Sequence, residues 1–159
     1  MNLTRNCTGP SPSKCPDTPT VFVVDSDASV RAELALLIRS GGWQPRTAAS
    51  AEEFLSRPRL MTPGCLLSEL HLPGLAGLDL QRLIVDRREL PIIFMSSRAD
   101  VQSAVQAMKG GALELLTKPL AAAMLFNAIR HALDHSRVAI LQQTELRALR
   151  ERYATLSRR

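Results

Sequence analysis

Short apolar segments alternate with longer segments of helical period along this chain, and that alternation restricts its fold more than any other feature. The apolar segments are nearly continuous, which is typical of strands buried on both faces of a parallel sheet. Right-handed crossovers between such strands favour a doubly wound α/β fold, with a five-stranded parallel sheet and an extended C-terminal helix. We expect strands at residues 20–25, 44–49, 64–69, 90–97 and 113–119, and helices at 28–42, 50–57, 78–88, 100–111 and from about 120 onward.

Capping signals mark the ends of three of these helices. Ser50 is followed three residues later by Glu53, which is the spacing of a capping box. Asp100 stands where an N-cap is expected, and Gly41 is expected to end the first helix.

The chain carries a formal net charge of +5, but this charge is not spread evenly along its 159 residues. Residues 130–159 hold seven arginines against three acidic side chains, and residues 1–20 carry a net charge of +1. Residues 21–129 hold eleven basic and eleven acidic side chains. The predicted folded core therefore has no excess positive charge with which to bind a nucleic-acid backbone.

The N-terminal residues 1–19 are rich in Pro, Ser and Thr, which predicts a disordered tail, and they lack the apolar segment of a signal peptide. No run of about 18 apolar residues is present, so we expect no membrane span and a cytoplasmic protein. Cys7 and Cys15 lie in the tail, where a redox role remains an alternative, and Cys65 is expected to be an inert buried thiol.

Polar side chains stand where four of the predicted strands end. The first strand ends in Asp25, Ser26 and Asp27, and the third ends in Glu69. The fourth ends in the serines at 96–97, and the fifth in Thr-Lys-Pro at 117–119. Carboxyl ends of parallel strands line the working crevice of a doubly wound fold, so these side chains are the candidate site.

An acid pair, a central carboxylate, a hydroxyl and a lysine before a proline, in this order, resemble the receiver domains of bacterial two-component response regulators, especially those of the FixJ type. The resemblance covers residues 20–135. It is carried by the segments "VFVVDSDASVR", "SAEEFL", "LPGLAGLDLQ", "LPIIFMSS", "AVQAMKGGALELLTKP" and "AIRHAL". The resemblance implies the flavodoxin-like fold of CheY-like receivers and a signalling role without enzymatic turnover.

A working receiver, by this resemblance, accepts a phosphoryl group on an aspartate at the end of its third strand, beside a Mg²⁺ ion. Asp25 matches the first acidic position of the family, whereas the second is occupied here by Ser26. Glu69 stands at the phosphoacceptor position, and the backbone carbonyl of His71 at that of the third metal ligand.

The remaining family positions are partly retained. Ser96 matches the hydroxyl and Lys118 the lysine that bind phosphoryl oxygens in the family. Leu115 replaces the aromatic residue that reports phosphorylation to a dimerisation face. Three functional positions, Ser26, Glu69 and Leu115, thus depart from the family pattern.

The expected charge of the pocket argues against a bound metal. Three carboxylates against one lysine would leave a net charge of about −2, which requires a divalent ion. Asp25 and Glu69 against Lys118 leave only about −1, so we expect Mg²⁺ binding to be weak or lost and no cofactor. Asp27 is expected to be a solvated loop acid, although it could partly replace the missing carboxylate.

Three interpretations of Glu69 remain open. Its longer side chain could extend toward Lys118 and Ser96 and imitate the phosphorylated state, which is the interpretation we favour. Alternatively, Glu69 fills an eroded pocket that has no fixed signalling state, or it is residually phosphorylated.

The last helix is expected to continue past the receiver, because residues 134–159 contain neither Gly nor Pro. Its heptad seam is imperfect and leaves open either a coiled-coil dimer or a solvated linker. His71, His131 and His135 show no metal-ligand spacing, and the last two are expected on a solvated helix face. The seam consists of Ala132, Ala139, Leu146 and Tyr153, with His135, Gln142, Leu149 and Leu156 three positions later.

These observations predict a receiver at 20–135 and a helical linker at 136–159 that leads to a LuxR-type helix-turn-helix domain absent from this chain. DNA would be bound only through that domain. The expected partners are a second copy, through the face formed by helix 100–111, strand 113–119 and the last helix, and a sensor histidine kinase. The competing hypotheses are a residually phosphorylatable receiver and a protein-binding adaptor module.

Overall fold

The computed structural model describes residues 18–98 and 100–158; the predicted tail, apart from residues 18 and 19, lies outside them. The strands are β1 (Thr20–Val24), β2 (Gln44–Ala48), β3 (Gly64–Glu69), β4 (Ile92–Ser96) and β5 (Glu114–Thr117). The helices are α1 (Ala28–Ser40), α2 (Ala51–Leu55), α3 (Gly77–Leu83), α4 (Val101–Lys109) and α5 (Ala122–Ser157).

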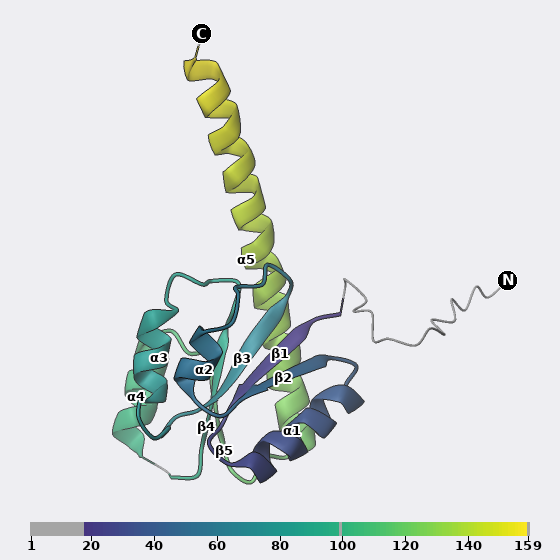
Figure 1. Ribbon diagram of the computed structural model, residues 1–159, viewed down its shortest axis with the longest axis vertical. Helices are drawn as coiled ribbons and strands as arrows, with labels where there is room; N and C mark the ends of the chain where they lie inside the picture. Colours follow the sequence, from purple (N-terminus) through teal and green to yellow (C-terminus); the bar gives the residue numbers. More distant parts are fainter. Residues whose placement is uncertain (1–17, 99, 159) are drawn as a thin grey trace, which may run out of the picture.

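The strands form one parallel sheet in the order β2-β1-β3-β4-β5 (Figure 1). The strand order reverses between β1 and β3, and this switch point opens a crevice at the carboxyl ends of the two strands. The doubly wound fold expected from the sequence is confirmed, and each strand lies within about two residues of its predicted bounds.

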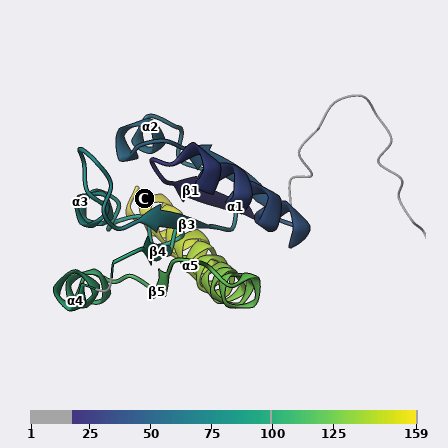
Figure 2. The same ribbon diagram turned by 90° about the horizontal axis from the view of Figure 1, so that it is seen from below.

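Helices cover both faces of the sheet (Figure 2). On one face α1 and α5 bury a cluster that includes Val23, Leu67 and Ile129. On the other face α2, α3 and α4 bury a cluster that includes Phe54, Leu80 and Phe94. Both cores use alternate residues of the same strands, because successive side chains of a strand point to opposite faces.

The three expected caps are present, and Gly41 is the C-cap of α1. The Ser50 hydroxyl accepts a hydrogen bond from the Glu53 amide over 3.1 Å, and Asp100 accepts one from the Gln102 amide over 3.1 Å. The Glu53 carboxylate bonds the amide of Ala49, so the capping box is shifted by one residue from the pattern expected.

The third helix is shorter than predicted, because it ends at Leu83 and not near residue 88. The backbone turns after Ile84, where the amide of Arg87 bonds the Ile84 carbonyl and that of Leu90 bonds the Arg87 carbonyl. Leu83 and Val85, both within the predicted helix, are exposed.

Helix α5 is 36 residues long and extends well beyond the amino ends of the strands (Figure 1). Its last buried residue is Ser136, so the packed part ends near the predicted receiver boundary. Ala132 is buried in the core and does not belong to an exposed seam, whereas Leu146, Leu149, Tyr153 and Leu156 are exposed. None of the described helices is long and apolar enough to cross a membrane.

An ion pair braces α5 where it leaves the sheet. The Glu89 side chain is only 2% exposed, and its carboxylate accepts two hydrogen bonds from Arg59, over 2.6 and 2.9 Å. The Ser136 hydroxyl donates to the Glu89 carbonyl and accepts from the Gly64 amide over 3.0 Å. Gln143 adds a contact of 3.4 Å to the same carboxylate, so loops before β3 and β4 are tied to α5.

Candidate functional site

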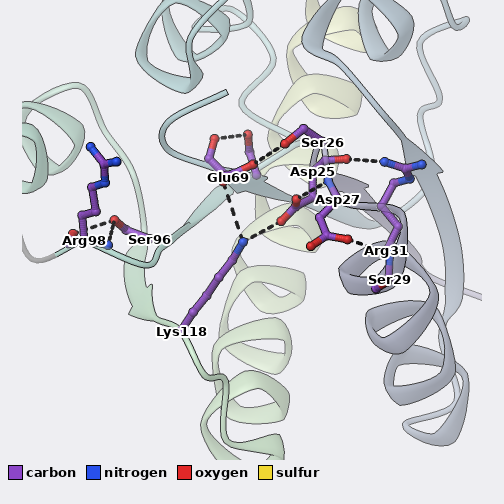
Figure 3. Close-up of polar contacts among 10 residues, drawn as sticks. Asp25, Ser26, Asp27, Ser29, Arg31, Glu69, Ser96, Arg98 and Lys118 are labelled. Carbon is purple, nitrogen blue, oxygen red and sulfur yellow. Dashed lines mark hydrogen bonds and ion pairs between the residues drawn. The ribbon is translucent and has the colours of Figure 1, made fainter. Parts of the chain in front are cut away.

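Asp25, Glu69 and Lys118 meet at the carboxyl end of the sheet (Figure 3). Each follows or ends a different strand, namely β1, β3 and β5. The Lys118 ammonium lies 2.7 Å from an Asp25 carboxylate oxygen and 3.9 Å from a Glu69 oxygen. The sequence-predicted constellation is thus brought together around the lysine, with two carboxylates against one ammonium.

Asp25 is the most constrained member of this group, with a side chain only 1% exposed. One carboxylate oxygen accepts from Lys118 and the other accepts the Asp27 amide over 2.9 Å. Its backbone carbonyl accepts a hydrogen bond from the Arg31 guanidinium over 2.7 Å. Burial of this charge is tolerated because both oxygens have charged or polar donors. The contact of Arg31 could not be predicted from the sequence, because a side-chain bond to a backbone carbonyl six residues earlier leaves no sequence pattern.

Glu69 reaches across the crevice with a side chain that is 19% exposed. One oxygen accepts a hydrogen bond from the Ser26 hydroxyl over 3.2 Å, and the other faces Lys118 at 3.9 Å. The second distance is too long for a hydrogen bond, so this pair interacts through charge alone. Gly77 packs closely against the end of β3 and leaves no room for a side chain, because a Cβ atom there would lie 2.7 Å from the Glu69 carbonyl oxygen.

Ser96 is turned away from Glu69. Its hydroxyl donates to the Arg98 carbonyl over 2.7 Å and accepts from the Arg98 amide over 3.2 Å. Figure 3 shows this serine engaged with its own loop, apart from the Ser26–Glu69 contact. The expected contact of Glu69 with Lys118 is present as a long ion pair, whereas the expected contact with Ser96 is replaced by this local turn.

Asp27 serves the first helix and not the crevice. Its carboxylate accepts the Ser29 amide over 2.8 Å and thereby caps α1. The residue is exposed, as expected for a solvated loop acid. Its carboxylate therefore does not replace the one that is missing at Ser26.

Leu115 is half-buried on β5 and packs against the cluster beneath α2, α3 and α4. Cys65 is fully buried in the opposite core, where burial raises the pKa of its thiol to about 12. Neither side chain contributes a polar atom to the crevice. Cys7 and Cys15 lie outside the described residues.

Residues 21–130 match the family model of the response regulator receiver domain. The chain belongs to this family. The resemblance expected from the sequence is thereby confirmed, and with it the flavodoxin-like, CheY-like class of fold.

Curated relatives of this receiver include the transcriptional regulatory protein TdiR of Thauera aromatica, 38% identical over 92% of the chain. The response regulator protein TmoT of Ectopseudomonas mendocina is 35% identical over 87% of the chain. The chain spans 65% and 64% of the lengths of these two proteins.

Solved structures agree with this assignment. That of the response regulator StyR is 35% identical, with a TM-score of 0.80 over 87% of this chain and 71% of that one. Full-length FixJ from B. japonicum is 32% identical, with a TM-score of 0.69 over 86% of this chain and 68% of that one.

The oxygens of this receiver's crevice do not fit the family's Mg²⁺ ion. Mg²⁺ requires near-octahedral oxygen coordination. Asp25 and Glu69 contribute two carboxylates, and both oxygens of Asp25 already accept hydrogen bonds. The Lys118 ammonium pairs with both acids, so its positive charge would repel a dication bound between them. Within residues 18–98 and 100–158, no group of three or more His, Cys, Asp or Glu side chains is arranged to hold a metal.

Proposed function

We propose that this chain is an atypical receiver of a DNA-binding transcriptional response regulator, which signals by dimerisation without ordinary aspartyl phosphorylation. The observation that carries the proposal is the placement of the Glu69 carboxylate between the Ser26 hydroxyl and the Lys118 ammonium. Glu69 thereby occupies the phosphoacceptor position as a permanent anion.

Electrostatics supports this reading. Lys118 already has a close counter-ion in Asp25 at 2.7 Å, and Glu69 adds a second negative charge at 3.9 Å. A phosphoryl group would bring further negative charge to a crevice that offers one lysine and no well-fitted dication. Like charges at such distances oppose one another strongly in a partly buried site. Phosphorylation is therefore disfavoured, and the receiver is proposed to act as a binding module and not as an enzyme.

The proposed output is a homodimer formed through α4, β5, α5 and the extended helix. Exposed apolar side chains on α4 include Val101, Val105 and Met108, and those on the extension include Leu146 and Leu149. Exposed apolar side chains on both elements support a role for them in association. A sensor histidine kinase is the proposed upstream partner, and DNA would be reached through a further domain, since curated relatives are longer than this chain.

Residual phosphorylation is the second candidate function. Glu69 is 19% exposed, so a phosphodonor can reach its carboxylate. A protein-binding adaptor would use the same α4–β5–α5 face without self-association, and a protein that remains monomeric with its full extension would favour it.

The deciding experiment treats the full chain with acetyl phosphate and Mg²⁺, or with beryllofluoride, and records intact mass and the dimer equilibrium by analytical ultracentrifugation. We expect no phosphoryl mass gain and no saturable shift in sedimentation. Glu69→Gln tests whether any response depends on the carboxylate.

A matched control restores the family pattern with Ser26→Asp and Glu69→Asp together, and this double variant is expected to bind Mg²⁺ and to respond. A mass gain in the unmodified chain that disappears in Glu69→Gln would establish the phosphorylatable receiver instead.

A further inference from the structure

Two histidines of α5 form a close pair on its exposed surface. The Nε2 atoms of His131 and His135 lie 3.2 Å apart, and the rings meet edge to face with centroids 4.7 Å apart. Residues four apart on a helix lie one turn apart on the same face, so the helix itself holds the two rings together. The expectation that these two histidines lack a metal-ligand spacing is therefore wrong, because the helix places their ring nitrogens side by side. Both residues are exposed, and this confirms the solvated face expected from the sequence.

The separation of the two nitrogens fits a shared metal ion. Imidazole nitrogens bind Zn²⁺ at about 2.0 to 2.1 Å, so two nitrogens on one tetrahedral ion lie about 3.3 Å apart. The observed separation of 3.2 Å, which without an ion is the length of an imidazole–imidazole hydrogen bond, is close to that value.

We propose that His131 and His135 form a two-imidazole site for a transition-metal dication of the Zn²⁺, Ni²⁺ and Cu²⁺ class. Imidazole pairs favour these ions, whereas Mg²⁺ and Ca²⁺ prefer oxygen ligands. Exposure of both rings lets an ion reach the nitrogens, and its remaining positions are filled by water. This site lies on α5, apart from the Asp25–Glu69–Lys118 crevice, and does not depend on the proposed function.

The location gives such an ion a structural consequence. His135 stands one residue before Ser136, the last buried residue of α5, and it lines a groove of about 380 Å³ with Gly110 and Gly111. No third His, Cys, Asp or Glu side chain of the described residues groups with the two rings, so the ligand set is the two rings alone. An ion held by both rings ties together successive turns where α5 leaves the body of the receiver.

The test titrates the metal-free full chain, carrying Cys7→Ser and Cys15→Ser to remove competing thiols, with Zn²⁺ and separately with Ni²⁺. Isothermal calorimetry gives stoichiometry and affinity, and histidine ring resonances report which imidazoles respond. We expect one ion per chain and shifts in His131 and His135. Single His131→Gln or His135→Gln is expected to weaken binding about a hundred-fold, because the second ligand of a chelate acts intramolecularly.

His71→Gln is the matched control, since His71 is the third histidine of the chain and is also exposed. Its affinity is expected to equal that of the parent. Three outcomes would each overturn the proposed site. They are undiminished binding in both His131→Gln and His135→Gln, loss of binding in His71→Gln, and ring resonances that do not change at millimolar metal. All three histidines are exposed, so these variants are expected to fold.

Discussion

Removal of Arg59 should destabilise the receiver far more than removal of a surface arginine. Arg59→Ala deletes both charge-assisted hydrogen bonds to Glu89 and leaves a carboxylate that is 2% exposed with only the 3.4 Å contact of Gln143. Loss of one partner of a buried ion pair costs about 3 to 5 kcal/mol. Arg59 is 37% exposed, so water can partly replace it, and we expect a loss of about 2 to 3 kcal/mol.

Thermal and urea unfolding of the full chain measure this loss, which corresponds to a fall in Tm of roughly 5 to 10 °C for a domain of this size. Arg82→Ala is the matched control, because Arg82 pairs with Asp79 at 3.5 Å on the surface and should contribute less than about 1 kcal/mol. Adding Glu89→Gln to Arg59→Ala should recover part of the loss, since the unpaired charge is removed. Equal losses in Arg59→Ala and Arg82→Ala would refute the reasoning.

Three further outcomes follow from the structure. Asp25→Ala should lower the unfolding free energy by about 3 kcal/mol, measured with urea, because Asp25 is buried beside Lys118. Glu69→Ala should lower it by less than about 1 kcal/mol, because Lys118 still pairs with Asp25. A larger loss in Glu69→Ala than in Asp25→Ala would contradict the geometry. In a variant that carries Cys7→Ser and Cys15→Ser, Cys65 should resist alkylation until the protein unfolds, and rapid labelling of the native protein would contradict this. Burial raises the pKa of the Cys65 thiol from 9.0 to about 12. The contribution of the protonated thiol to stability is therefore present at neutral pH and is lost as the pH rises from 9.0 to about 12. Ending the chain after Gln143 should change the unfolding free energy by less than about 0.5 kcal/mol, since residues 144–158 are exposed. A larger loss by urea titration would show that the extension packs on the body.

Four of the strands could be predicted closely because each is an apolar run followed by polar residues, and that pattern follows from burial on both faces. Strand β2 lacks the pattern, since it reads QPRTA. The end of α3 could not be predicted, because apolar residues continue past Leu83 and neither Gly nor Pro stands where the backbone turns. The burial of Glu89 could not be predicted from the sequence either. Its partner Arg59 is 30 residues away, and only the folded loops bring the two together.

Membership of the candidate site was predictable, whereas its hydrogen bonds were not. Parallel strands deliver their carboxyl ends to one edge, so Asp25, Glu69 and Lys118 had to lie near one another. Which acid holds the lysine depends on side-chain length and burial. The Lys118 ammonium lies 2.7 Å from an Asp25 carboxylate oxygen and 3.9 Å from a Glu69 oxygen, although the glutamate side chain is longer. The rotation of Ser96 toward its own loop has no sequence signature.

The departures at Ser26 and Glu69 are physically coupled. The Ser26 hydroxyl donates to the Glu69 carboxylate over 3.2 Å, so a carboxylate at position 26 would stand against a like charge at about the same distance. The family resolves such crowding with a dication, which this crevice does not fit. A serine at 26 therefore makes the longer acid at 69 tolerable without metal, and the hydrogen bond holds that acid away from Ser96. Glu69 on these grounds supplies a fixed negative charge to the crevice without drawing in the hydroxyl that a phosphoryl group is expected to attract.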